Sequence, residues 1–174
     1  YRAYLDALHI QPETIHDFRS IPFLPISFFK SQEVKTGSFN PVLVFESSGT
    51  MGSHTSRHFV ADPELYKLSF THGFERVYGS PSDYCIIGLL PSYLERQHSS
   101  LVYMVDHLIL ESRHPHSGFY LYDHDKLARV LKELEQQKQP TLLIGVTFAL
   151  LDFAASHPMP LKHTVIMETG GMKG

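Results

Sequence analysis

The chain has 174 residues, the length of one ordinary domain, and its 43% hydrophobic content is enough for a real core. Fifteen basic and eighteen acidic residues give a net charge of -3, which offers no general attraction to nucleic acid or to an anionic membrane. No apolar run approaches the roughly 20 residues of a membrane-spanning helix, and a single cysteine excludes an internal disulfide. Composition therefore predicts a cytoplasmic protein without a nucleic-acid partner or a membrane span.

Residues 1–40 are predicted to form a helical lead-in. Two short helices are expected in residues 1–20, where Pro12 suits the first position of the second helix. Pro22 and Pro25 then favour an extended segment, because proline cannot supply a backbone donor and disfavours helix in the residue before it.

Residues 41–60 predict two short strands joined by a loop rich in Ser, Gly and Thr. The first strand is mostly β-branched or aromatic, and Gly49 and Gly52 permit backbone angles that other residues resist. Unpaired amides and hydroxyls that converge in such a loop can cradle a phosphate. The alternative is a plain hairpin turn with polar residues, and the composition of the loop alone favours this alternative.

A long helix is predicted to begin at Asp62-Pro63, a cap residue followed by proline at the first helical position. Gly79 followed by Ser80-Pro81 is expected to end this helix. Its apolar side chains recur at helical spacing and predict packing against a sheet; they are Tyr66, Phe70, Phe74 and Val77.

Residues 61–174 alternate apolar strands with capped helices, which is typical of βα units. The predicted strands are 84–90, 119–122, 141–146 and 163–167. The predicted helix caps are Ser99 or Ser100, Asp123 or Asp125, and Thr147. The helix that begins at Asp123 or Asp125 is expected to turn Leu127, Val130, Leu131 and Leu134 inward and Lys132, Glu133, Glu135 and Gln136 outward. The predicted fold class is α/β, a mostly parallel sheet flanked by helices.

Ligands of an open parallel sheet bind beyond the carboxyl ends of its strands. The residues expected there are Pro91-Ser92-Tyr93, Tyr122-Asp123-His124, Val146-Thr147 and Glu168-Thr169-Gly170-Gly171. Glycines in the last group allow backbone to approach a flat ligand closely. The alternative for that group is a simple exit from the last strand.

The loop Ser47-Ser48-Gly49-Thr50-Met51-Gly52 resembles the phosphate loop of adenylate-forming enzymes, the acyl-CoA synthetase and phenylacetate-CoA ligase superfamily. It keeps the Ser-Gly-Thr-x-Gly frame but has Met51 where threonine is usual, and Ser53-His54-Thr55 where a lysine normally follows. Three further stretches resemble the LuxE-type acyl-protein synthetases of that superfamily. They are Ile21-Pro22-Phe23-Leu24-Pro25-Ile26 with Phe29-Lys30, Leu90-Pro91-Ser92-Tyr93-Leu94-Glu95-Arg96, and Met167-Glu168-Thr169-Gly170-Gly171-Met172-Lys173-Gly174.

The resemblance implies ATP-dependent activation of a carboxylic acid, most simply a fatty acid, as an acyl-adenylate for transfer to a thiol acceptor. An acyl-accepting protein such as a reductase would then be a partner. The residues implied at the β- and γ-phosphates are Ser47, Ser48, Gly49, Thr50 and Gly52. Those implied along the adenine and ribose are Thr169, Gly170 and Gly171, and the acyl-site candidates are Ser92 and Tyr93.

The resemblance also implies that residues 1–174 are a single domain, the amino-terminal part of a longer enzyme and inactive alone. The family's Mg²⁺-binding Tyr-Gly-x-Thr-Glu motif and its catalytic lysine would both lie beyond Gly174, so no catalytic residue is assigned within the chain. The competing hypothesis is a non-catalytic α/β module that binds phosphate or a partner. Met51 and the absent lysine favour it.

Other reactive residue types are predicted to be structural. Cys85 lies within an apolar strand, where a thiol is usually buried and inert. His54 and His58 do not share a helical face, and His114-Pro115-His116 has no third ligand nearby, whereas a metal site needs about four ligands, or three and a water. No metal-binding residue is therefore predicted.

Overall fold

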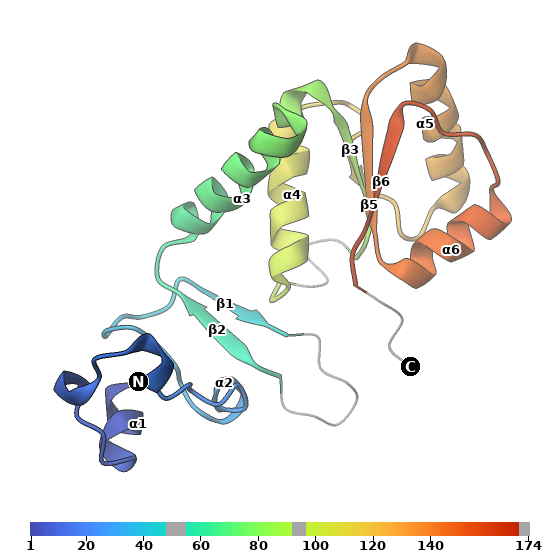
Figure 1. Cartoon of the computed structure of the whole chain (residues 1–174). Coiled ribbons are helices and arrows are strands. Elements are labelled where there is room, and N and C mark those ends of the chain that lie inside the picture. The colour runs from blue at the N-terminus through green and yellow to red at the C-terminus, as the bar shows by residue number, and fades with distance from the viewer. Residues whose placement is uncertain (48–54, 92–96, 171–174) are drawn as a thin grey trace. The chain divides into compact units, whose positions relative to one another are not determined.

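The computed structural model describes residues 1–47, 55–91 and 97–170 of the chain (Figure 1). These residues belong to two compact units, Tyr1–Pro63 and Glu64–Gly174. The boundary lies close to residue 61, where the sequence changes from the predicted hairpin to the βα repeats. Among the described residues, no helix combines the length and the apolar character needed to cross a membrane.

The first unit begins with helix α1, Arg2–Ala7, and continues with two one-turn 3-10 helices, Pro12–Thr14 and Phe18–Ser20. The predicted second short helix does begin at Pro12, as a 3-10 helix of one turn, and it ends where the chain becomes extended at Ile15 (φ -89°, ψ 105°).

The short helix α2, Phe28–Ser31, follows the proline segment and carries two ring contacts within the first unit. Phe28 packs edge-on against Tyr4 at 5.5 Å between ring centroids. Phe29 stacks on His58 at 5.1 Å, which ties α2 to the hairpin that follows it in sequence.

The predicted pair of short strands is present, as β1, Leu43–Glu46, and β2, Arg57–Val60. They pair antiparallel, with Leu43 opposite Val60 and Glu46 opposite Arg57. The loop between them is the one whose sequence resembles a phosphate loop, and its residues 48–54 lie outside the described residues.

The second unit is built on a four-stranded sheet in the order β4-β3-β5-β6. Its strands are β3, Cys85–Leu89; β4, Gly118–Phe119; β5, Thr141–Gly145; and β6, Thr164–Glu168. All three neighbouring pairs are parallel, which confirms the predicted parallel sheet. Only β4 is much shorter than predicted, because the Asp123 amide donates to the Tyr120 carbonyl at 3.1 Å and turns the chain away.

Two pairs of helices cover opposite faces of this sheet (Figure 1). On one face lie α3, Pro63–Tyr78, and α4, Ser100–Ser112; on the other lie α5, His124–Gln137, and α6, Thr147–Ser156. The central strands are buried on both faces, which explains their almost uniformly apolar sequences. The hydrophobic core beneath α3 and α4 contains the sheet residues Ile86, Leu142 and Ile144. The core beneath α5 and α6 contains the sheet residues Ile87, Leu89 and Leu143.

The aromatic stripe of α3 packs on the core as predicted, except at one position. Phe74 is buried, but Val77 is 73% exposed, so its predicted core position is wrong. The stripe continues instead through Tyr78, whose ring lies 5.1 Å from that of Phe74. A constant spacing of four residues keeps Tyr66, Phe70, Phe74 and Tyr78 on one side, whereas Val77 falls on its flank.

Two predicted helix caps are present. The Ser99 hydroxyl accepts a hydrogen bond from the Val102 amide at 3.3 Å, and the Asp123 carboxylate accepts one from the Lys126 amide at 2.9 Å. The outward position predicted for Glu135 is wrong: its carboxylate bends back to the beginning of β6.

Candidate functional site

The order of the strands creates a switch point between β3 and β5. The chain passes from β3 through α4 to β4 on one side of this pair, and from β5 through α6 to β6 on the other. In open α/β sheets, ligands bind outside the carboxyl ends of the strands at such a point. The described residues that follow these two strands are Leu90-Pro91 and Val146-Thr147. The predicted acyl-site residues Ser92 and Tyr93 lie outside the described residues.

Thr147 connects the start of α6 to the loop that leaves β6. It was predicted to cap α6, and this prediction is wrong: Val146 occupies the cap position and Thr147 is the first helical residue. Its hydroxyl instead lies within hydrogen-bond distance of the Glu168 carboxylate and the Gly170 carbonyl. Because a hydroxyl has one hydrogen, Thr147 donates to one of these acceptors at a time.

Thr169 and Gly170, which the resemblance assigns to a nucleotide, lie beside the end of β5. The Thr169 amide donates to the Gly145 carbonyl at 2.9 Å, and its hydroxyl approaches the same oxygen at 3.2 Å. Gly170 has φ +86°, a conformation that favours glycine. The loop is therefore held by backbone pairing on one side and by Thr147 on the other. Gly171 lies outside the described residues.

Ser47 is the one residue of the predicted phosphate loop that the structure describes, and it closes the β1–β2 hairpin. Its amide donates to the Ser56 carbonyl at 3.0 Å, and its hydroxyl oxygen accepts from the Ser56 amide at 3.0 Å. Ser48, Gly49, Thr50 and Gly52 fall outside the described residues, so the phosphate-binding assignment stays a prediction.

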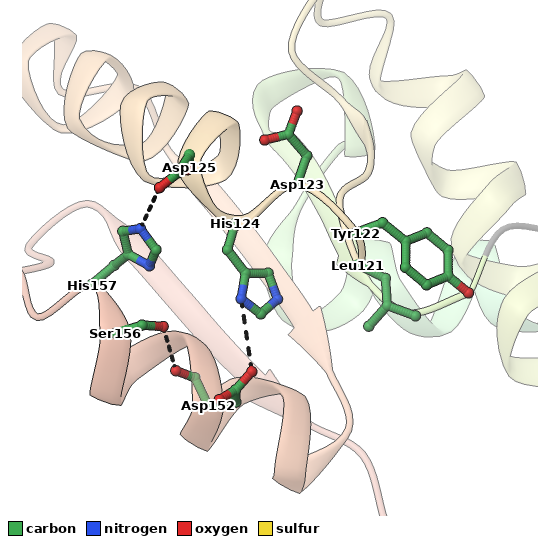
Figure 2. Close-up of a pocket in the computed structure, with 8 residues that line it drawn as sticks. All are labelled: Leu121, Tyr122, Asp123, His124, Asp125, Asp152, Ser156 and His157. Carbon is green, nitrogen blue, oxygen red and sulfur yellow. Dashed lines mark hydrogen bonds and ion pairs between the residues drawn. The ribbon is translucent and has the colours of Figure 1, made fainter.

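The second unit also has an open depression of about 490 Å³ where α5 begins and α6 ends (Figure 2). It includes the segment after β4 that was predicted to lie at the carboxyl edge of the sheet. Its lining is rich in carboxylates and imidazoles; the residues are Leu121, Tyr122, Asp123, His124, Asp125, Asp152, Ser156 and His157.

Two imidazole–carboxylate pairs cross between α5 and α6 in this depression (Figure 2). His157 Nε2 lies 3.0 Å from Asp125 Oδ1, and His124 Nδ1 lies 3.9 Å from Asp152 Oδ2. Each side of the contact thus contributes one histidine and one aspartate. The His157 ring also stacks on Phe153 at 5.3 Å, and its buried Nδ1 has no hydrogen-bond partner among the described residues.

This cluster was missed by sequence reasoning, because Asp125 and His157 are 32 residues apart in the sequence and come together only when α5 and α6 pack side by side. Its geometry does not form a hydrolytic triad, since the Ser156 hydroxyl donates to the Asp152 carbonyl at 2.6 Å and not to an imidazole. Within residues 1–47, 55–91 and 97–170, no three metal-binding side chains converge on one point. The two histidine–aspartate pairs therefore connect the start of α5 to α6 and the residue that follows it.

Cys85 is fully buried at the start of β3, as predicted. Burial raises the pKa of its thiol to about 11, against the smaller opposing effect of a Ser117 hydroxyl 3.8 Å away. A thiol of this kind carries little thiolate near neutral pH and is a poor nucleophile. It is therefore unsuited to accept an acyl group.

No protein-family model matches the chain, and no curated protein or solved structure matches it either. The family resemblance therefore rests on the motifs in the sequence alone.

Proposed function

We propose that this chain is the nucleotide-binding part of an acid-activating, adenylate-forming ligase. The observation that supports this most is the loop 168–170, held by Thr147 next to the carboxyl ends of β5 and β6. This loop has the Thr-Gly sequence that the resemblance assigns to adenine and ribose. It adjoins the β3/β5 switch point, where doubly wound sheets commonly bind nucleotides.

In the proposed reaction, a carboxylate oxygen of the substrate attacks the α-phosphorus of ATP, and the bond to the bridging oxygen of pyrophosphate breaks. The acyl-adenylate then passes its acyl group to a thiol, with AMP as the leaving group. Bringing two anions together requires hydrogen-bond donors and Mg²⁺ more than a general base. The chain is proposed to supply donors from residues 47–52, while the resemblance assigns Mg²⁺ binding and the catalytic lysine to motifs that residues 1–174 do not contain.

The first test is direct binding of ATP by the chain, measured by isothermal titration calorimetry. Thr147→Val removes the hydroxyl that holds Gly170 and is expected to weaken ATP binding about tenfold, the loss of roughly 1.4 kcal/mol. Thr147→Ser keeps the hydroxyl and should restore binding. Thr164→Val is the matched control, because it removes a threonine–glutamate hydrogen bond at the opposite end of the same strand.

A chain that binds no ATP, or that binds ATP equally well with Thr147→Val and without it, contradicts this assignment of the loop. Gly49→Val tests the other segment, since a Cβ there would restrict the backbone of the predicted phosphate loop. In a longer polypeptide that carries the Mg²⁺ and lysine motifs, the same variant should sharply reduce ATP–pyrophosphate exchange driven by a fatty acid.

The second proposal is a non-catalytic module that binds phosphate or a partner. The position of Ser47 favours it, because its hydroxyl oxygen is already used within the hairpin by the Ser56 amide. This proposal predicts no acid-dependent exchange in the longer polypeptide across short and long acids. The adenylate-forming proposal predicts exchange with at least one of these acids.

A further inference from the structure

The two edges of the sheet differ in how they are protected. The strand at one edge, β4, has two residues, and very short edge strands resist pairing with other chains. The strand at the other edge, β6, has five residues with the sequence Thr-Val-Ile-Met-Glu and contains no proline or lysine. Val165 is 43% exposed and Ile166 is 53% exposed, so this strand lies partly open on both of its faces.

The hydrogen bonds of β6 show which of its backbone groups point away from the sheet. The His163 carbonyl accepts from Thr141 in β5, and the Thr169 amide donates to Gly145 in β5. The side of a strand to which the amide and carbonyl of a residue point alternates from one residue to the next. In β6, the amides and carbonyls of the odd-numbered residues therefore point toward β5. The amides and carbonyls of Thr164, Ile166 and Glu168 therefore point outward, where the described residues provide no neighbouring strand.

We infer that β6 is a self-pairing edge, through which two copies of this chain associate antiparallel about a two-fold axis at Ile166. In this register, Ile166 lies opposite Ile166 of the second copy, and Thr164 lies opposite Glu168 of the second copy. All of these positions present outward amides and carbonyls, so they form the hydrogen-bonded pairs of an antiparallel ladder. Val165 then lies opposite Met167 of the second copy.

The charges beside β6 favour a second copy as the occupant. Lys162 is exposed just before the strand, and Glu168 is exposed at its end. In the proposed register, Lys162 lies diagonal to Glu168 of the second copy, a position that long side chains reach across two strands. The two-fold axis creates this opposite-charge pair twice. It also closes the assembly, so the result is a dimer and not a fibre.

The expected dimer is weak. A contact built on two five-residue strands is smaller than the roughly 1,200 Å² or more that stable complexes bury. Association should therefore depend on protein concentration over an accessible range. The inference does not depend on nucleotide binding, although Glu168 belongs both to the β6 edge and to the 168–170 loop.

Sedimentation equilibrium over a wide concentration range tests the inference. The weight-average mass should rise from 19.8 kDa toward twice that value as concentration increases. Ile166→Pro removes an outward amide that the β5–β6 ladder does not use, and proline is tolerated at such edge positions. This variant should raise the dissociation constant about tenfold or more. A chain that stays monomeric throughout, or an Ile166→Pro variant that dimerises like the parent, overturns the inference.

Charge exchange tests the register without altering the backbone. Lys162→Glu and Glu168→Lys should each raise the dissociation constant about fivefold, because each replaces two attractive pairs by two repulsive ones. The double variant should recover the parent value. Additive weakening in the double variant contradicts the antiparallel register. If circular dichroism shows that the Ile166→Pro variant does not fold, the charge-exchange variants still test the inference.

Phe23→Lys is the control for non-specific association, because Phe23 is 84% exposed and lies in the other unit. It should leave the dissociation constant unchanged. A loss of association equal to that of Ile166→Pro would mean that general hydrophobic contact, and not the β6 edge, holds the copies together.

Discussion

The carboxylate of Glu135 in α5 accepts a hydrogen bond from the Thr164 hydroxyl in β6 at 2.7 Å. The same carboxylate accepts from the amides of Lys162 at 2.8 Å and His163 at 3.0 Å. One side chain thus satisfies three donors at the point where the edge strand begins. The contact thus connects the end of α5 to the beginning of β6, a strand that has a neighbouring strand on one side only among the described residues.

Removing the Glu135 carboxylate should destabilise the second unit. Glu135→Ala leaves the Lys162 and His163 amides and the Thr164 hydroxyl without their acceptor, and a lost hydrogen bond to a charged group costs about 1.5–3 kcal/mol. Urea denaturation at neutral pH measures the change. Lys132→Ala, at an exposed position on the same helix, is the control and should change the free energy of unfolding by less than about 0.5 kcal/mol.

The Glu135 contact should also depend on pH. Desolvation is the largest single effect and raises the pKa, but the bonds from Lys162, Thr164 and His163 together outweigh it and lower the pKa below its ordinary value. A lowered folded pKa gives stability that is complete above the unfolded pKa of about 4.3 and is lost as the pH falls through the folded value. The difference between parent and Glu135→Gln should therefore shrink on acidification, and a pH-independent difference would contradict the contact.

The Cys85 thiol should be unreactive in the folded chain. Its pKa of about 11 means that its stabilising effect is complete below the unfolded pKa of about 8.5 and declines as pH rises toward 11. An aromatic disulfide reagent at pH 8 should label Cys85 only after urea is added. Rapid stoichiometric labelling of the native chain would show that the start of β3 opens readily.

Two glycines should respond oppositely to alanine. A Cβ at Gly88 would lie 2.7 Å from the Phe119 ring, so Gly88→Ala should destabilise the chain by about 1–3 kcal/mol through overpacking. A Cβ at Gly73 in α3 would meet nothing within 4 Å, so Gly73→Ala should stabilise the helix by about 0.5–1 kcal/mol. Thermal unfolding of both variants checks the pair, and a shift in the same direction for both would contradict this packing.

The two histidine–aspartate pairs between α5 and α6, His157–Asp125 and His124–Asp152, should contribute little to stability. Asp125 is 82% exposed and Asp152 is 76% exposed, and solvent screens such pairs to about 0.2–1 kcal/mol. A double-mutant cycle of His157→Gln with Asp125→Asn should give a coupling energy in this range. A coupling of several kcal/mol would show that the pair is shielded from solvent.

Local sequence determined most of the second unit. The apolar runs and the cap residues Ser99 and Asp123 predicted the strands, the helix starts and the parallel sheet, because an apolar pattern and a cap are both signals carried by neighbouring residues. The short strands around the Ser/Gly loop were predicted in the same way. The assignment of that loop to phosphate depends on a ligand and remains a prediction.

Only the tertiary structure decided which polar side chains reach across the fold. Thr147 and Glu135 both suit ordinary helical roles locally, as a cap and as a solvated surface residue. Each instead binds β6, Thr147 at its carboxyl end and Glu135 at its beginning. The histidine–aspartate pairs between α5 and α6 and the open edge of β6 likewise follow from strand order and helix placement. Hydrogen bonds between distant residues leave no periodic signal in a sequence, so their partners emerge only when the chain is folded.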